Sequence, residues 1–225
     1  MGRAIYGESV TSTTAAAREP RSFTFRFVCL LASIGVVGVG IALMVSAELG
    51  VAPADVLSTG GAEQLDIGVG TMGWICGGVY TLLAIALRRP PQWGTLLGAV
   101  LVGVAVNLSL EAIPEPDALA WRIPMMLVGL TLLYAAISVG VSTMLGTGPI
   151  ELIMLGLADR GLNMQVARWL IEAVVFVGGV ILGGQIGVGT LLFVVLTGPV
   201  LARTLPPVAR FMGTTVLDAP HGLDA

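Results

Sequence analysis

The sequence predicts an all-α polytopic membrane protein of six transmembrane helices. It further predicts two inverted three-helix repeats, each with a short half-helix after its first span. Three observations favour this fold. The 225 residues are 56% hydrophobic and only 11% charged, with a mean hydropathy of +0.94, unlike a soluble domain. Apolar runs long enough to cross a bilayer recur along the chain. Finally, one nine-residue motif occurs twice.

That motif reads LGVAPADVL at residues 49–57 and LGTGPIELI at residues 145–153. Two later features repeat at nearly the same offset: Trp74 corresponds to Trp169, and the segment GTLL occurs at both 94–97 and 189–192. A one-residue change in offset is typical of a diverged internal duplication. Each copy contains three apolar runs, and an odd number of spans inverts the second copy relative to the first, as in many transporters and channels.

The six expected spans are residues 27–46, 69–87, 95–110, 123–144, 166–182 and 186–205. Runs this long and continuous favour helices over a transmembrane β-barrel. The expected organisation is a disordered cytoplasmic tail at 1–24, a first membrane repeat at 25–112, a second at 113–210 and a cytoplasmic tail at 211–225.

The basic residues predict the orientation. All eleven are arginine, and ten of them fall on one side of the predicted spans, in the tails, in the connections or near the ends of the spans, with only Arg122 on the other side. Connections on the cytoplasmic side of a membrane are enriched in basic residues. We therefore expect the protein to lie in the inner membrane with both termini in the cytoplasm.

The repeated motif has the chemistry of a helix start. Gly50 and Gly146 would allow a sharp turn away from the preceding span. Pro53 and Pro149 suit the first helical position, where no backbone N–H is needed. The helix starting at Pro149 would be short and apolar, too short to cross a bilayer, which indicates a re-entrant or interfacial half-helix.

Asp55 and Glu151 would lie in the first turn of these two half-helices. Two opposed half-helices could bring both acids near the bilayer midplane, where transporters often bind solute. The alternative is that each acid only caps its own helix. Because a carboxylate already occupies each helix start, a cation, a proton or an amine fits such a site better than an anion does.

Two further polar residues within the predicted spans are candidates for solute or ion binding. Glu172 could couple transport to protons, or it could simply pair with Arg168 four residues earlier. Asn107 could line a cavity, or it could join two helices by hydrogen bonds.

The sequence contains no metalloprotease helix, nucleophile elbow, phosphate loop or cysteine–histidine cluster. We therefore expect no enzymatic activity, no catalytic residue, no metal and no cofactor. The expected partners are the lipid bilayer, a small cationic or proton-coupled solute, and a second copy or another membrane subunit; nucleic acid is not expected.

The motif at 49–57, the glycine-rich GVGT at 68–71 and the hairpin from Arg88 to the GTL at 94–96 resemble the YczE/YyaS/YitT-like bacterial integral membrane proteins. The resemblance covers about residues 25–210. The family pattern has a tryptophan where this chain has Ala54 and Ile150. The resemblance implies a multi-pass inner-membrane protein.

The function expected from these features is transport of a small solute through a channel or carrier. The alternative is a membrane accessory or scaffold subunit, or the substrate-binding subunit of a larger complex, without a solute path of its own. Under the first hypothesis, Asp55→Asn and Glu151→Gln impair transport and leave the protein folded.

Overall fold

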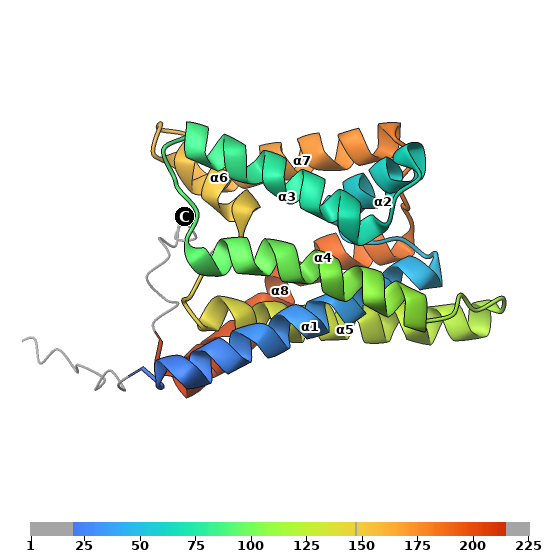
Figure 1. Cartoon of the computed structure of the whole chain (residues 1–225), viewed down its shortest axis with the longest axis horizontal. Helices are drawn as coiled ribbons and strands as arrows, with labels where there is room; N and C mark the ends of the chain where they lie inside the picture. Colours follow the sequence, from blue (N-terminus) through green and yellow to red (C-terminus); the bar gives the residue numbers. More distant parts are fainter. Residues whose placement is uncertain (1–19, 147, 215–225) are drawn as a thin grey trace, which may run out of the picture.

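The computed structural model describes residues 20–146 and 148–214, which form eight helices and no strands (Figure 1). The helices are α1 (Phe23–Ala47), α2 (Pro53–Leu65), α3 (Val69–Ala86), α4 (Trp93–Ala112), α5 (Leu119–Ser142), α6 (Pro149–Ala158), α7 (Met164–Ile181) and α8 (Val188–Met212).

Six of these helices, α1, α3, α4, α5, α7 and α8, are long and apolar enough to cross a membrane. This confirms the prediction of an all-α protein with six spans. The two remaining helices, α2 and α6, have 13 and 10 residues and follow the first and fourth spans, where short helices were predicted.

Three predicted boundaries need correction. The helix α5 begins at Leu119, before the predicted 123, and contains Pro124 in its second turn. The helix α8 continues to Met212, beyond the predicted 205 and into the predicted tail. Met212 is buried, and its carbonyl accepts a hydrogen bond of 3.0 Å from the N–H of Arg21. At the other end, α1 begins at Phe23, within the predicted tail. Most of the two predicted tails lies outside the described residues.

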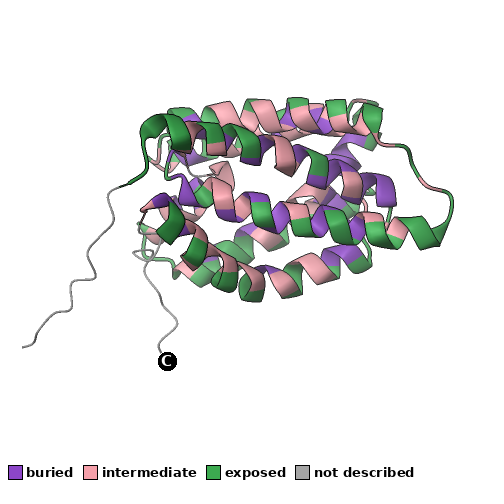
Figure 2. Ribbon diagram, turned by 90° about the horizontal axis from the view of Figure 1, so that it is seen from below, coloured by how far each residue is buried: buried purple, intermediate pink, exposed green. Residues whose placement is uncertain are grey.

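The helices α1 and α5 pack together more extensively than any other pair, and they run in opposite directions (Figure 1). Glycines permit the close crossing, since a Cβ on Gly129 would lie 2.8 Å from the carbonyl oxygen of Gly40. Met44, Leu130 and Leu133 are buried around this crossing. Figure 2 shows the buried residues turned toward the interior and exposed residues on the outer faces, where lipid would lie.

The short helices pack across the sequence halves. The helix α2 packs against α7 as well as its neighbour α3, and α6 packs against α3 as well as its neighbour α7. In Figure 1, α2 lies toward the end of the bundle where α1 finishes, and α6 lies toward the opposite end. Each short helix therefore depends on the other half of the chain for its packing.

Apart from Arg122, the described arginines lie in the half of the bundle that contains the start of α1, near the starts of α1 and α7, after α3 and α6, and in the last part of α8 (Figure 1). There Arg26 donates a hydrogen bond of 2.7 Å from Nε to the carbonyl of Thr143. Arg160 donates one of 2.9 Å to the carbonyl of Leu87. Arg122 alone among the described arginines lies toward the opposite end, where it pairs with Glu48 at 2.7 Å. The uneven distribution of arginine along the sequence thus corresponds to an uneven distribution between the two ends of the bundle.

Candidate functional site

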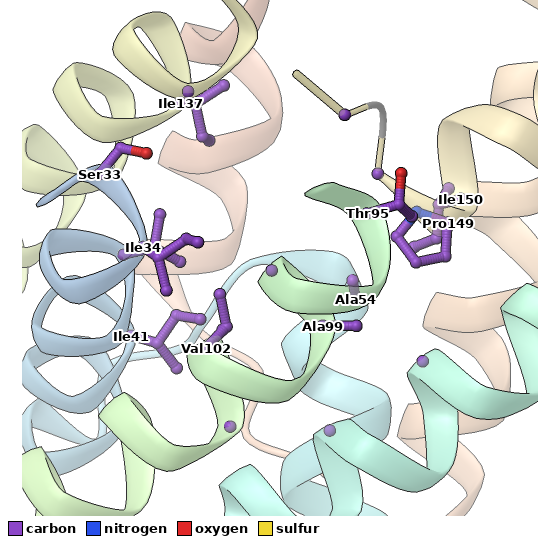
Figure 3. Close-up of a pocket in the computed structure, with 18 of the residues that line it drawn as sticks. Ser33, Ile34, Ile41, Ala54, Thr95, Ala99, Val102, Ile137, Pro149 and Ile150 are labelled. Carbon is purple, nitrogen blue, oxygen red and sulfur yellow. The ribbon is translucent and has the colours of Figure 1, made fainter. Parts of the chain in front are cut away.

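A cavity of about 570 Å³ lies within the bundle, between α1, α3, α4, α5 and the first turns of α2 and α6 (Figure 3). Its walls are mainly apolar. Both copies of the repeated motif contribute to it: Ala54, Asp55 and Ser58 from α2, and Pro149, Ile150 and Glu151 from α6. Figure 3 shows Ala54 and Ile150 on separate segments that border the same space. Two motifs almost a hundred residues apart therefore meet at one cavity.

Asp55 is the acid best placed to contact a molecule in this cavity. Its side chain is half-buried, and none of the described residues forms a hydrogen bond or ion pair with its carboxylate. The backbone N–H of Asp55 is used locally and donates to the carbonyl of Ala52 at 2.8 Å. The carboxylate is thus held on a helix start with its oxygens available.

The helix α3 provides polar groups beside this carboxylate. Cys76 and Tyr80 both line the cavity and lie near enough to Asp55 to interact with it electrostatically. The buried hydroxyl of Tyr80 lies beside the thiol of Cys76, a weak partner, and bonds to no oxygen or nitrogen among the described residues. A buried hydroxyl without a good partner is costly unless a ligand or water satisfies it.

Sequence reasoning did not single out Tyr80, Cys76 or Ser58. The available signal was spacing, because Cys76 and Tyr80 stand four residues apart on α3 and share a face with Gly73 and Gly77. A small-residue face that carries isolated polar groups indicates a helix that borders a cavity. The sequence alone does not show that this face of α3 lies beside Asp55, because that depends on where α2 packs.

Glu151 is placed differently from Asp55, although it also lines the cavity. It is exposed, and its carboxylate folds back over the start of its own helix, where its Cδ lies 3.1 Å from the place a Cβ on Gly148 would occupy. This position suits interaction with the free N–H groups of the first turn. The local capping alternative therefore describes Glu151 better than it describes Asp55.

The two motif glycines serve partly different purposes. Gly50 has φ +101°, so it makes the predicted turn. Gly146 does not have a positive φ and does not make the turn; the turn after α5 is made instead by Met144 at φ 54°. Gly146 is needed because a Cβ there would lie 2.5 Å from the backbone nitrogen of Thr95. The prediction of a glycine turn is thus confirmed for Gly50 and wrong for Gly146.

The prolines occupy the first positions of α2 and α6, as predicted. Pro149 lines the cavity, whereas Pro53 lines a separate groove between α7 and α8.

The remaining candidates lie outside the cavity lining. Asn107 joins α4 to α3, since its Oδ1 accepts from the N–H of Gly70 at 2.9 Å and its Nδ2 donates to Thr71 at 3.2 Å. Glu172 accepts a hydrogen bond from Arg168 at 2.9 Å and lines the groove between α7 and α8. Asn107 thus joins two helices and Glu172 pairs with Arg168, which are the structural alternatives stated for these two residues. Among residues 20–146 and 148–214, no group of three or more metal-ligating side chains occurs.

The six apolar spans and the two short helices define a multi-pass membrane protein. The model of DUF6198, described as a family of unknown function, matches residues 24–205, and the chain belongs to this family.

Three curated relatives are similar to this chain. An "Uncharacterized protein" of Haemophilus influenzae is 30% identical over 182 residues, which are 80% of this chain and 84% of the relative. The "Uncharacterized membrane protein YczE" of Bacillus subtilis is 26% identical over 199 residues, 87% and 93% of the two chains. The "Uncharacterized protein YyaS" of the same organism is 27% identical over 180 residues, 78% and 90%. These matches confirm the resemblance seen in the sequence. No solved structure matches the chain.

Proposed function

We propose that this protein transports a small cationic or proton-coupled solute, and that the cavity between α2 and α6 is the solute site. The observation that carries the proposal is the convergence of both motif copies on one cavity, where the carboxylate of Asp55 has no partner among the described residues. An ionisable group inside a membrane protein is costly, and it is usually retained because it binds or moves something.

The chemistry of the cavity favours a cation. Asp55 supplies negative charge, and Ser58 and Tyr80 supply oxygens that can accept hydrogen bonds. The lining residues include the carboxylic side chains of Asp55 and Glu151 and no arginine, lysine or histidine. One carboxylate can hold either a proton or a cationic group, so competition between them at Asp55 would couple solute movement to proton movement. Glu172, outside this cavity, stays a prediction as a proton-coupling acid.

The proposal includes the inverted-repeat architecture. It is supported by the antiparallel packing of α1 and α5 and by a reciprocal contact between the halves (Figure 1). The GTLL segment that starts α4 packs against Gly146 of the second motif, and the GTLL segment of α8 packs against Gly50 of the first. Two repeats that pack reciprocally around one shared cavity are typical of alternating-access transporters.

We place the protein in the cytoplasmic membrane with both termini inside the cell. The support is the gathering of the described arginines, apart from Arg122, in the half of the bundle where α1 begins and α8 ends (Figure 1). Positive charge near the ends of spans favours the cytoplasmic face.

The test is charge movement in proteoliposomes on a solid-supported membrane, with methylammonium, choline, guanidinium and spermidine as probes and neutral isosteres as blanks. We expect a transient current with at least one cation, lost in Asp55→Asn and retained in Asp66→Asn. Asp66 is a matched control because it ends the same helix, is exposed, and has a left-handed conformation that asparagine accepts.

A current that survives Asp55→Asn would contradict the assignment of the site. If no current appears and the protein instead purifies in mild detergent with a stoichiometric membrane partner, it is an accessory subunit and not a transporter.

A further inference from the structure

The groove between α7 and α8 is a second concave feature, separate from the solute cavity. Its volume is about 480 Å³, and its inner wall includes Pro53 at the start of α2. Its other lining residues are mostly apolar and come from α7, the loop before α8 and the first turns of α8.

Among the described residues, the pair α7 and α8 lacks the side-chain hydrogen bonds that join its counterpart in the first half, the pair α3 and α4. Between α3 and α4, the indole N–H of Trp74 donates to the carbonyl of Val100 at 2.8 Å, and Asn107 bonds to Gly70. Ninety-five residues later, Trp169 corresponds to Trp74 and Ala202 to Asn107. Trp169 is 63% exposed and makes no hydrogen bond among the described residues, and alanine cannot make the amide's bonds.

The polar groups of the groove are few and specific. Glu172 is the one charged residue among those that line it; Arg168, its ion-pair partner, is not among them. Thr190 also lines the groove and is 6% exposed, and its buried hydroxyl has no hydrogen-bond partner among the described residues. A buried hydroxyl left without a partner is satisfied by a ligand or a water.

Size and chemistry together indicate the occupant. The groove has the volume of a small-molecule site, with apolar walls, an indole and one carboxylate. A cationic head would be attracted by Glu172 and by the face of Trp169, and an apolar body would replace lipid against α7 and α8.

We propose that the α7–α8 groove binds an amphipathic amine, with its ammonium head on Glu172 and its alkyl chain along α7 and α8. The head takes the place of the Arg168 guanidinium on the carboxylate. This site is independent of the solute cavity and does not require that the protein transport anything.

The experiment uses the full chain in phosphatidylcholine nanodiscs and a twelve-carbon alkylamine that carries a nitroxide near its head. The nitroxide quenches tryptophan fluorescence at short range. Subtraction of the signal from Trp169→Phe isolates quenching at Trp169. The reference probe is the same nitroxide chain ending in an alcohol.

We expect the amine to quench Trp169 saturably, at a lower mole fraction than the alcohol. The difference should be less than about fivefold, the upper range for one half-exposed charge pair, because the amine must displace Arg168 from Glu172. Glu172→Gln should abolish the preference, and Glu111→Gln, which removes an acid outside the groove, should leave it intact. Arg168→Gln should strengthen amine binding, because the competing cation is gone.

Equal quenching by the amine and the alcohol would overturn the proposal, as would a preference that survives Glu172→Gln. A final comparison distinguishes the source of the amine. Competition by phosphatidylethanolamine in the nanodisc would assign the groove to a lipid headgroup, and no competition would assign it to a free amphipathic amine; both results support binding of an ammonium head.

Discussion

Gly94 lies directly against Gly146. A Cβ on Gly94 would overlap the carbonyl oxygen of Leu145 and lie 3.3 Å from the nitrogen of Gly146. The equivalent contact joins Gly189 to Gly50, where a Cβ on Gly189 would overlap the carbonyl oxygen of Gly50. Each motif is thus held by the start of the last span of the other sequence half. The repeated residues are needed because backbone meets backbone at these two places.

Gly94→Ala should therefore destabilise the protein by about 1–3 kcal/mol, because the new methyl group meets backbone that cannot rotate away. The measurement is reversible unfolding in mixed micelles. Gly73→Ala on α3 is the matched control, since a Cβ there meets nothing within 4 Å. The control should be neutral or stabilising by up to about 1 kcal/mol from helix propensity. Equal stability of the two variants would contradict the close approach.

Asn107→Ala should loosen the pair α3 and α4. The substitution leaves the N–H of Gly70 without its side-chain acceptor and removes the bond to Thr71. Interhelical hydrogen bonds in membranes average about 0.6 kcal/mol, so a loss of about 1 kcal/mol is expected for the two bonds. The same unfolding assay measures it, with Thr131→Ala as a control, because Thr131 bonds only within its own helix. A change no larger than the control's would argue against the bridging role.

The two motif acids should respond differently to neutralisation. Asp55→Asn should lower cation-evoked current by at least about tenfold, the loss of one charge-assisted contact of roughly 1.4 kcal/mol or more. Glu151→Gln should lower the current less than Asp55→Asn does. Its main effect should be on stability, at about 0.5–1 kcal/mol, because its carboxylate lies over the start of α6. Larger current loss in Glu151→Gln would reverse this assignment.

The ion pair of Arg89 and Asp159 links the loop after α3 to the end of α6. The hydrogen bond from Arg89, together with its charge, holds the pKa of Asp159 below its usual range. A lowered carboxyl pKa in the folded state stabilises that state above the unfolded pKa, near 4, and the effect fades as pH falls through the folded value. Stability should thus decline below about pH 4.

Arg89→Gln should reduce the loss of stability at low pH, by the share of it that comes from protonation of Asp159. Thermal unfolding between pH 3 and 6 at low salt measures it. The contribution should shrink at high salt, because both side chains are largely exposed. An unchanged profile in Arg89→Gln would show that other groups carry the acid dependence.

Much of this architecture was predictable because hydropathy and helix-start chemistry are local. The spans, the short helices at Pro53 and Pro149, and the turn at Gly50 all follow from neighbouring residues. The end of α8 was not predictable in this way, since Pro206 and Pro207 indicate a stop, yet the helix continues through them to the buried Met212.

The candidate site was predictable only in part. Asp55 and Glu151 could be named from the repeat, but their different roles depend on Gly148 and on the distant face of α3. Tyr80 and Thr190 matter because tertiary packing buries their hydroxyls, and no short-range pattern reports that.

The most direct test of the inverted architecture is side-specific labelling of single cysteines at Leu65 and Leu162, with Cys29 and Cys76 replaced by alanine. Both leucines are exposed; Leu65 is the last residue of α2, and Leu162 lies in the loop between α6 and α7. A membrane-impermeant maleimide should label Leu65→Cys only from outside intact cells and Leu162→Cys only in inside-out vesicles. Labelling of both from the same side would contradict the inverted repeats and remove the main support for a transporter.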